Sequence, residues 1–247
     1  MYNRFAYLYD DLMNDVDYEK WVDYYFKIFR RYGLEPKLGL DLGCGTLARL
    51  TGRVPPEDLT ALVFSHWHSD HCSDVLPLIY RMASVAARRG ADFRPLPVYG
   101  PEDESSPVRR EVQQCPQMEL HTVRPGDAWT LGTVEVRAFA ARHPVPALMY
   151  RLESAGKRLA FTGDTNITEA LPALAKDADL LLADGLFPEA AWGAQKPHLS
   201  AKLCAELARD AGAKRLVLTH LNPEFDPETL LREAKSIYPG AELAKIG

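Results

Sequence analysis

The chain has 247 residues, of which 47% are hydrophobic, so it can form one large α/β domain or two small ones and is not disordered. Its net charge of −5 argues against permanent residence on nucleic acid. No run approaches the roughly 18 apolar residues of a membrane span, and the four cysteines form no C-x-x-C pair. We therefore expect a cytoplasmic protein with no membrane partner.

Residues 1–37 are rich in aromatic residues. Between residues 17 and 32 the apolar positions recur at helical spacing, and Gly33 and Pro36 follow as a helix end would require. The pattern predicts an amphipathic helix whose aromatic stripe packs on a core rather than binding a ligand. The stripe consists of Tyr18, Trp21, Val22, Tyr25, Phe29 and Tyr32.

The next segment, residues 38–46, reads as a strand that turns on glycines into a helix at 47–53. Its glycines would admit a ligand close to the backbone, as in a nucleotide-binding turn. Together with the aromatic helix, residues 1–46 resemble the beginning of a class I S-adenosylmethionine-dependent methyltransferase. The resemblance ends at Leu47, which stands where that family has a third glycine, so we expect no methyl transfer.

A cluster of metal-binding residue types follows the short apolar strand 61–64. His66 and His68 are two residues apart and would point the same way if the strand continued. Asp70 and His71 lie on the turn that follows. Neutral imidazoles and carboxylates suit zinc, manganese or iron(II), and this cluster can supply ligands to two adjacent ions.

The rest of the chain alternates between helices and strands. We predict helices at 73–82, 199–211 and 227–237 and an irregular surface excursion at 102–116. Residues 91–100 are predicted to be a linker and a strand that ends in 97–101. The other predicted strands are 132–139, a hairpin of 148–153 and 157–161, 180–183, 215–219 and 242–245. Further candidate site residues come just after these strands, where α/β proteins build their sites: His143, Asp164, Asp184 and His220.

From about residue 40 to residue 247 the chain resembles the metallo-β-lactamase superfamily, because residues 66–71 look like its His-x-His-x-Asp-His motif. The resemblance implies an α/β fold, the αββα sandwich, and a two-metal hydrolase in which a bridging hydroxide attacks the substrate. The implied metals are two divalent ions, zinc above all, with manganese or iron(II) as alternatives. The implied ligands are His66, His68 and His143 for one ion, Asp70, His71 and His220 for the other, and Asp164 bridging both.

Residues 197–201, Pro-His-Leu-Ser-Ala, resemble the ribonuclease Z-like branch of that superfamily. The resemblance implies that His198 contacts the scissile phosphate and that Asp184 orients it, although the branch often has glutamate there. It gives Asp70 a catalytic role besides its metal-binding one. His198 could instead be a helix-entry histidine with a local hydrogen bond, with Ser200 as the helix cap.

The branch implies phosphodiester substrates, from tRNA 3′ ends to cyclic nucleotides. We favour a small-molecule or nucleotide phosphodiester over tRNA, because the chain has no long basic arm and Leu199-Ser200 replaces the Ser-Thr of the tRNA-processing members. Two alternatives stay open: a lactone or thioester hydrolase, and a metal-binding protein with impaired catalysis. We expect Cys72 to be a buried packing residue and His121 a surface or strand residue.

The two resemblances meet at residues 38–47. We therefore divide the chain into an aromatic, methyltransferase-like head, 1–37, and a metallo-β-lactamase-like domain, 38–247, and interpret it as a chimera, natural or constructed. The head would replace the first strands of the superfamily fold with an atypical helical segment. The aromatic helix would then cover the apolar face left open, or mediate self-association as a homodimer.

Overall fold

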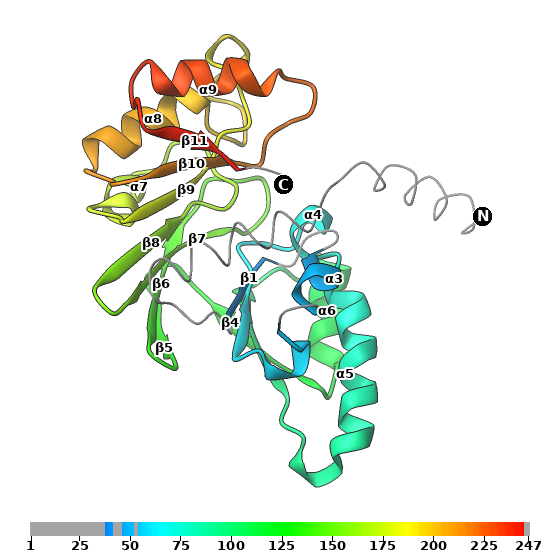
Figure 1. The fold of residues 1–247 in the computed structure, drawn as a ribbon. Helices are drawn as coiled ribbons and strands as arrows, with labels where there is room; N and C mark the ends of the chain where they lie inside the picture. The colour runs from blue at the N-terminus through cyan, green and yellow to red at the C-terminus, as the bar shows by residue number, and fades with distance from the viewer. Residues whose placement is uncertain (1–37, 42–45, 52–53, 245–247) are drawn as a thin grey trace, which may run out of the picture.

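The computed structural model describes residues 38–41, 46–51 and 54–244, so the predicted aromatic head, its helix and any self-association through it lie outside the described residues. Among the described residues, a pair of β-sheets face each other, and helices cover the outer side of each sheet (Figure 1). This αββα arrangement confirms the predicted α/β fold class.

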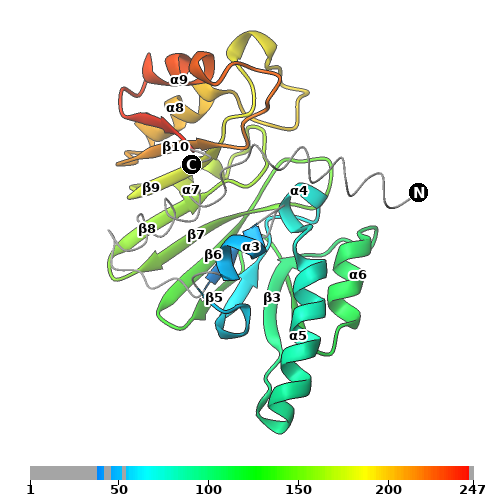
Figure 2. The same cartoon turned by 45° about the vertical axis from the view of Figure 1, so that its right-hand side comes forward.

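The first sheet contains four parallel strands in the order β1-β2-β3-β4. Its outer face is covered by two helices, and Leu78 and Met82 of the longer one pack with Leu62 and Val98 of the sheet (Figure 2). The strands are β1 (Leu38–Leu40), β2 (Ala61–Val63), β3 (Leu96–Pro101) and β4 (Met118–Val123), and the covering helices are α5 (Val75–Arg89) and α6 (Pro107–Gln114). Short helices lie in the connections: α3 (Thr46–Thr51), η1 (Pro56–Asp58), α4 (Ser69–Cys72) and η2 (Gly90–Asp92).

Helix α6 corrects the prediction that residues 102–116 are irregular. Ser106 caps it by accepting a hydrogen bond from the Arg109 N–H at 3.2 Å, and Pro107 occupies its first turn. Val112 is buried against the first sheet. The polar composition hid the helix because only one side of it is buried.

The second sheet contains seven strands in the order β11-β10-β9-β8-β7-β6-β5. It is antiparallel from β5 to β8 and parallel from β8 to β11. Its strands are β5 (Ala128–Leu131), β6 (Val134–Ala140), β7 (Leu148–Ser154), β8 (Lys157–Phe161), β9 (Leu180–Asp184), β10 (Leu216–Thr219) and β11 (Ala241–Leu243). The helices α7 (Leu171–Ala175), α8 (Ala201–Asp210) and α9 (Pro227–Lys235) cover its outer face, and η3 (Glu189–Ala191) precedes α8.

The predicted strands of this sheet are confirmed within a few residues, and so are helices α8 and α9. The hairpin β7–β8 turns at Ala155 and Gly156, which both have positive φ, at 48° and 71°. Strands β4 and β5 had no predicted counterpart. Neither contains a continuous apolar run, because Glu119, His121 and Thr122 interrupt β4 and Thr130 interrupts β5, so their sequences carry weak strand signals.

Contacts between the two sheets hold the histidine-rich segment after β2 in place. The Tyr150 hydroxyl of β7 donates to the Phe64 carbonyl at 2.9 Å, and the Leu148 N–H donates to the Ser65 carbonyl at 2.9 Å. Tyr150 and Phe64 are both fully buried. The residues that follow β2 are therefore fixed against the second sheet, where the other candidate ligands lie.

Among the described helices, none combines the length and the apolar composition needed to cross a membrane.

Candidate metal centre

The structure brings all seven predicted metal ligands together where the strands end. They come from the loops after β2, β6, β8 and β10 and from α4, which lies at the upper end of the first sheet in Figure 1. Three groups have ligand atoms within 4.8 Å of one another and share Asp164. The first is His66, His68, His143 and Asp164, the second is Asp70, His71, Asp164 and His220, and the third is Asp164, Asp184, His198 and His220.

In the first group three imidazoles aim ring nitrogens at one another. His68 Nδ1 lies 2.9 Å from His66 Nε2 and 3.2 Å from His143 Nε2. Asp164 Oδ2 lies 3.7 Å from His66 Nε2. Burial above all, and next the neighbouring His71, lower the pKa of His66 to about 3, so His66 is a neutral imidazole with a lone pair to offer. This is a donor set for a divalent cation.

In the second group two carboxylates and two imidazoles converge. His71 Nε2 lies 3.4 Å from Asp70 Oδ2 and 3.2 Å from Asp164 Oδ1. His220 Nε2 lies 3.4 Å from Asp70 Oδ2, and its Nδ1 lies 3.0 Å from Asp164 Oδ1. Asp70 lies at the mouth of the site, with its side chain 59% exposed, whereas the Asp164 side chain is only 3% exposed.

The charge balance of this group calls for positive charge. Burial by itself would lower the pKa of His220, but the carboxylates of Asp164 and Asp184 raise it to about 11. Burial likewise opposes a raised pKa at His71, and the nearby carboxylates of Asp164 and Asp41 outweigh it. The imidazoles in turn hold the pKa of Asp164 well below its ordinary value, against the effect of burial. Protons on the imidazoles can supply the positive charge that the carboxylates favour, and a divalent cation can supply it in their place.

Buried polar atoms that lack hydrogen-bond partners indicate whether a cation fits this cluster. Asp164 Oδ1, Asp184 Oδ1 and His220 Nδ1 are buried and lack a hydrogen-bond partner among the described residues. Buried polar atoms without partners are rare and costly, and all three of these point into one cluster. Their convergence, together with the imidazole and carboxylate donors, fits a bound metal.

Bonds behind the cluster fix the ligand orientations. The His71 Nδ1–H donates to Asp41 Oδ2 at 2.8 Å, and the His66 Nδ1–H donates to Ser65 Oγ at 3.0 Å. The Ser65 hydroxyl then donates to Asp41 Oδ2 at 2.7 Å, so one carboxylate steadies a histidine of each group. His143 Nδ1 lies 3.5 Å from the Pro197 carbonyl. Such outer contacts leave the opposite ring nitrogen free for a metal.

Asp41 was missed as a site residue, because the sequence placed it in a nucleotide-binding turn. Its position directly after a strand, β1, was the available signal. It has a φ of 46°, and His220 has a φ of 55°, and both angles are unusual for residues other than glycine. Backbone strain of this kind collects at functional sites, where surrounding contacts hold it.

The predicted pairing of His198 with Asp184 is present. The His198 Nδ1–H donates to Asp184 Oδ2 at 2.7 Å, and Asp184 Oδ2 also accepts the Thr165 N–H at 3.1 Å. His198 Nδ1 lies 3.9 Å from Asp164 Oδ2, beside the cluster. The shorter aspartate reaches because the bridge between Phe187 and Ser200 draws residues 185–200 back towards the end of β9.

Three other residues with predicted roles lie in or near this region. Ser200 caps α8 by accepting the Leu203 N–H at 3.2 Å, so the cap is supplied by Ser200 and not by His198. Cys72 is fully buried and its thiol points at the His68 carbonyl, which confirms a packing role. His121 lies on β4, stacked on Tyr99, outside the cluster.

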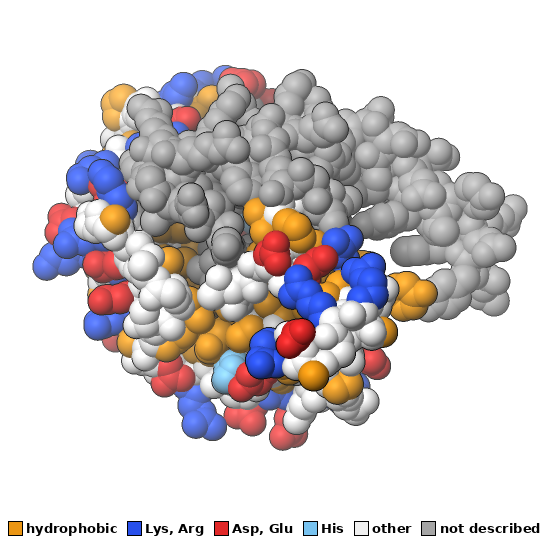
Figure 3. All heavy atoms as spheres, turned by 60° about the horizontal axis from the view of Figure 1, so that its bottom comes forward, with side chains coloured by type: hydrophobic (Ala, Val, Ile, Leu, Met, Phe, Trp, Pro, Cys, Tyr) orange, Lys and Arg blue, Asp and Glu red, His pale blue; other side chains and the backbone are white. Residues whose placement is uncertain are grey.

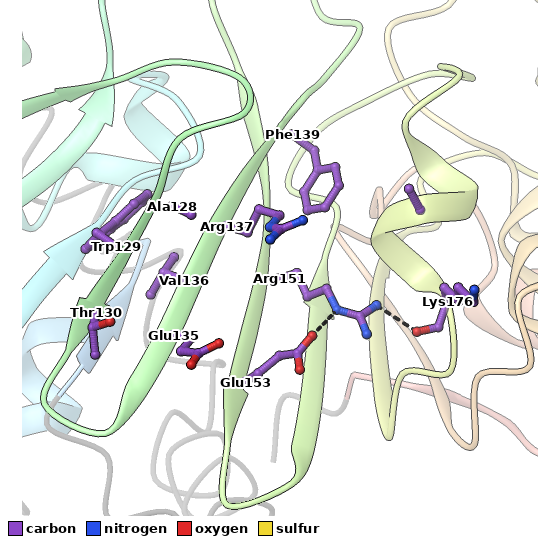
Figure 4. Close-up of a pocket in the computed structure, with 11 residues that line it drawn as sticks. Ala128, Trp129, Thr130, Glu135, Val136, Arg137, Phe139, Arg151, Glu153 and Lys176 are labelled. Carbon is purple, nitrogen blue, oxygen red and sulfur yellow. Dashed lines mark hydrogen bonds and ion pairs between the residues drawn. The ribbon is translucent and has the colours of Figure 1, made fainter.

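A hollow of about 510 Å³ lies elsewhere, on the outer face of β5–β7 beside α7 (Figure 4). Arg151 crosses it and is bonded to Glu153 Oε1 at 2.6 Å and to the Lys176 carbonyl at 2.7 Å. Its lining contains none of the predicted site residues. The chemistry of the described chain therefore gathers at the metal-ligand cluster and not in this hollow.

Comparisons with known proteins agree with this geometry. Residues 41–221 match the profile of the "Beta-lactamase superfamily domain". The chain is 30% identical over 216 residues to the probable metallo-hydrolase YhfI of Bacillus subtilis, covering 84% of this chain and 85% of that protein. The crystal structure of YhfI has a TM-score of 0.77 to this chain at 28% identity, covering 85% of each.

The chain is also similar to two other proteins. Ribonuclease Z of Methanopyrus kandleri is 27% identical over 246 residues, covering 85% of this chain and 86% of that protein. A diphosphatase from the PhnP family shares the fold, with a TM-score of 0.65 at 20% identity over 83% of this chain and 76% of that one. The matched profile begins at residue 41, and these comparisons lend no support to a methyltransferase-like head or to a chimera.

Proposed function

The chain belongs to the metallo-β-lactamase superfamily, and from this premise we propose that it is a hydrolase that cleaves phosphodiester bonds with two divalent metal ions, zinc above all. The observation that carries the proposal is the position of Asp164. Its Oδ2 faces His66 of one ligand group, and its Oδ1 faces His71 of the other. A buried carboxylate shared in this way suits a bridge between two adjacent cations.

The proposed ligand sets are those implied by the sequence. His66, His68 and His143 would hold one ion, Asp70, His71 and His220 would hold the other, and Asp164 would contact both. When bound, such ions acidify a water molecule and polarise the oxygens of a phosphoryl group. The chain itself fixes the donors, and Asp41 does so through the Nδ1–H of His71.

His198 is proposed as the acid that protonates the leaving oxygen. Its Nδ1–H is committed to Asp184, so Nε2 is the atom that can hold the transferred proton. The buried Asp184 carboxylate accepts this N–H and keeps the ring oriented. Asp70, exposed at the mouth, adds negative charge beside the proposed second ion and is the most accessible of the carboxylates.

Two similarities support a phosphorus substrate. One is to a ribonuclease Z and the other is to a diphosphatase, and both names denote enzymes that act on phosphate esters or anhydrides. We favour a small or nucleotide phosphodiester over tRNA, because no long basic arm interrupts residues 54–244. On the face in Figure 3, the Lys and Arg side chains that are described alternate with Asp and Glu, without one broad basic patch.

The cysteines are compatible with the proposed cytoplasmic location. Cys115 and Cys204 are free and buried, and a reducing compartment would keep them so.

The decisive experiment measures bound metal and phosphodiester hydrolysis on the same preparation. Elemental analysis of the purified full chain should give two equivalents of a divalent metal. The protein should release p-nitrophenolate from bis(p-nitrophenyl) phosphate. This activity should stop when the metal is chelated and return when zinc or manganese is added. A preparation without zinc, manganese or iron would contradict the proposal.

A parallel substrate panel separates the alternatives. Turnover of a lactone or a thioester with none of the diester would identify the other hydrolase activity of the fold. Two bound metals with no turnover of any ester would indicate a metal-binding protein with impaired catalysis.

A further inference from the structure

The segment immediately before His198 is held by its backbone carbonyls. Asn166 Nδ2 donates to the Gly193 carbonyl at 3.4 Å and to the Lys196 carbonyl. Asn166 is fully buried and lies only two residues after Asp164. One amide group therefore connects the loop that carries the shared metal ligand to the loop that carries His198.

The orientation of Asn166 is itself determined. Its Oδ1 accepts the Ile167 N–H at 2.6 Å, and its own N–H donates to the Arg142 carbonyl at 3.0 Å. The amide cannot rotate without breaking a bond at one end. Its Nδ2 therefore presents two N–H donors in a fixed direction, towards residues 193–196.

Two other residues bind the same segment. A guanidinium N–H of Arg142 donates to the Ala194 carbonyl at 3.1 Å. His143 Nδ1 lies 3.5 Å from the Pro197 carbonyl. Four of the five carbonyls from Gly193 to Pro197 thus have partners on the loops of His143 and Asp164. Asn166 is the buried centre of this contact, and Arg142 is its exposed rim.

We propose that Asn166 is a positioning residue that sets the place of His198 relative to the metal ligands. The proposal rests on the function proposed above, in which His198 protonates the leaving oxygen. Hydrolysis adds a water oxygen to phosphorus, breaks the bond to the leaving oxygen and transfers the His198 proton to that oxygen. The proton that the water loses then replaces the one that His198 gave up. The ring must lie within hydrogen-bond reach of this oxygen, so a shift of about 1 Å in its loop costs rate.

The test uses two diesters that differ in their need for this proton. Thymidine p-nitrophenyl phosphate releases p-nitrophenolate, which leaves as an anion, whereas thymidylyl-thymidine releases an alkoxide that needs a proton. In zinc-loaded Asn166→Asp, kcat for thymidylyl-thymidine should fall at least about tenfold, and kcat for the nitrophenyl ester should fall less than about threefold. The zinc content should match that of the wild type.

A double-mutant cycle tests whether Asn166 acts through His198. In a His198→Ala background, Asn166→Asp should cause no further loss on thymidylyl-thymidine, because the group that it positions is gone. Arg142→Met should cause a weaker loss that is also selective for thymidylyl-thymidine. Because Arg142 is exposed, this variant should fold even if the buried Asn166→Asp does not. Equal losses on the two diesters, or additive losses in the cycle, would overturn the proposal.

Asn222→Asp is the matched control. Asn222 also lies two residues after a proposed ligand, His220, and its Oδ1 accepts the Glu224 N–H at 2.9 Å, a bond that aspartate keeps. This variant should retain the wild-type ratio of the two rates. A ratio altered as much as in Asn166→Asp would show that any such loop change has the effect, and would overturn the proposal.

A second readout does not depend on turnover. In the zinc-loaded wild type, the His198 Nδ1–H bonded to Asp184 should give a downfield proton resonance. It should broaden or move in Asn166→Asp and persist in Asn222→Asp, and an unchanged resonance in Asn166→Asp would overturn the proposal. If wild-type protein cleaves neither diester, the proposed function fails while this resonance still decides the role of Asn166.

Discussion

Asp41 Oδ2 lies 2.8 Å from His71 Nδ1, across 30 residues of sequence. The same oxygen accepts the Ser65 hydroxyl, which in turn accepts the Nδ1–H of His66. One carboxylate at the end of β1 therefore orients a histidine in each ligand group. This contact joins the first described strand to the chemistry of the site.

Asp41→Asn should weaken metal binding without unfolding the protein. The amide keeps the shape of the side chain but removes the charge that holds His71, and losses at such outer contacts are about 10-fold to 100-fold in metal affinity. Competition with a chromophoric chelator measures the change. Asp58→Asn, at a half-exposed carboxylate paired with Arg89, is the control and should bind like the wild type. Unchanged affinity in Asp41→Asn would contradict the assigned role.

Asp164→Asn should lower the metal content of both ligand groups. Its two oxygens face different groups, and an amide can replace neither the charge nor both donor atoms. Elemental analysis should give fewer than two ions per chain, with activity lost. Asp103→Asn alters another buried carboxylate, whose Oδ1 accepts the N–H and the hydroxyl of Ser105, and should keep both ions. Retention of two ions by Asp164→Asn would refute the bridge.

His198→Ala should separate catalysis from metal binding. The chain should keep its metal and lose about 10²-fold to 10⁴-fold in kcat on diesters with alkyl leaving groups, as expected when a general acid is removed. Asp184→Asn should cause some of this loss, because the amide still accepts the Nδ1–H but lacks the charge. His121→Ala, on β4 outside the cluster, is the control. Loss of metal from His198→Ala would instead make His198 a ligand.

Asp179→Asn should destabilise the fold in a pH-dependent way. The buried carboxylate accepts the Arg158 N–H at 2.9 Å and the Lys214 ammonium at 2.8 Å. Burial raises its pKa, but the bonds from Lys214 and Arg158 outweigh burial, so the pKa is lower in the folded than in the unfolded chain. The stabilisation is therefore present above the unfolded pKa of about 3.9 and is lost as the pH falls through the folded pKa.

Urea unfolding at several pH values measures this effect. At pH 7 the variant should have a free energy of unfolding about 1–3 kcal/mol below that of the wild type, and the difference should shrink below about pH 4. Asp210→Asn changes an exposed carboxylate beside Arg209 and should differ little from the wild type at any pH. A difference independent of pH would show that lost packing, and not charge, is responsible.

The sequence by itself determined which residues are candidate ligands of the site. Each candidate carries a local signature: His66, His68, Asp70 and His71 lie in one short motif, His220 follows β10 directly, and His143 and Asp164 lie in the loops just after β6 and β8. Such signals can be read from the sequence because neighbouring parallel strands end at the same edge of a sheet, so that residues just after them meet there. The strands themselves were predictable where apolar runs were continuous, as in β9, and not where they were short, as in β4 and β5.

Only the tertiary structure decided the features that depend on contacts between distant loops. Asp41 reads as a member of a glycine turn until β1 pairs with β2 and sets its carboxylate against Ser65 and His71. Asn166 carries no motif, and its contact with residues 193–196 exists because the sheet brings the loops after β8 and β9 together. Residue types thus determine which atoms can bind a metal, whereas the packing of the loops determines which neutral side chains hold them in place.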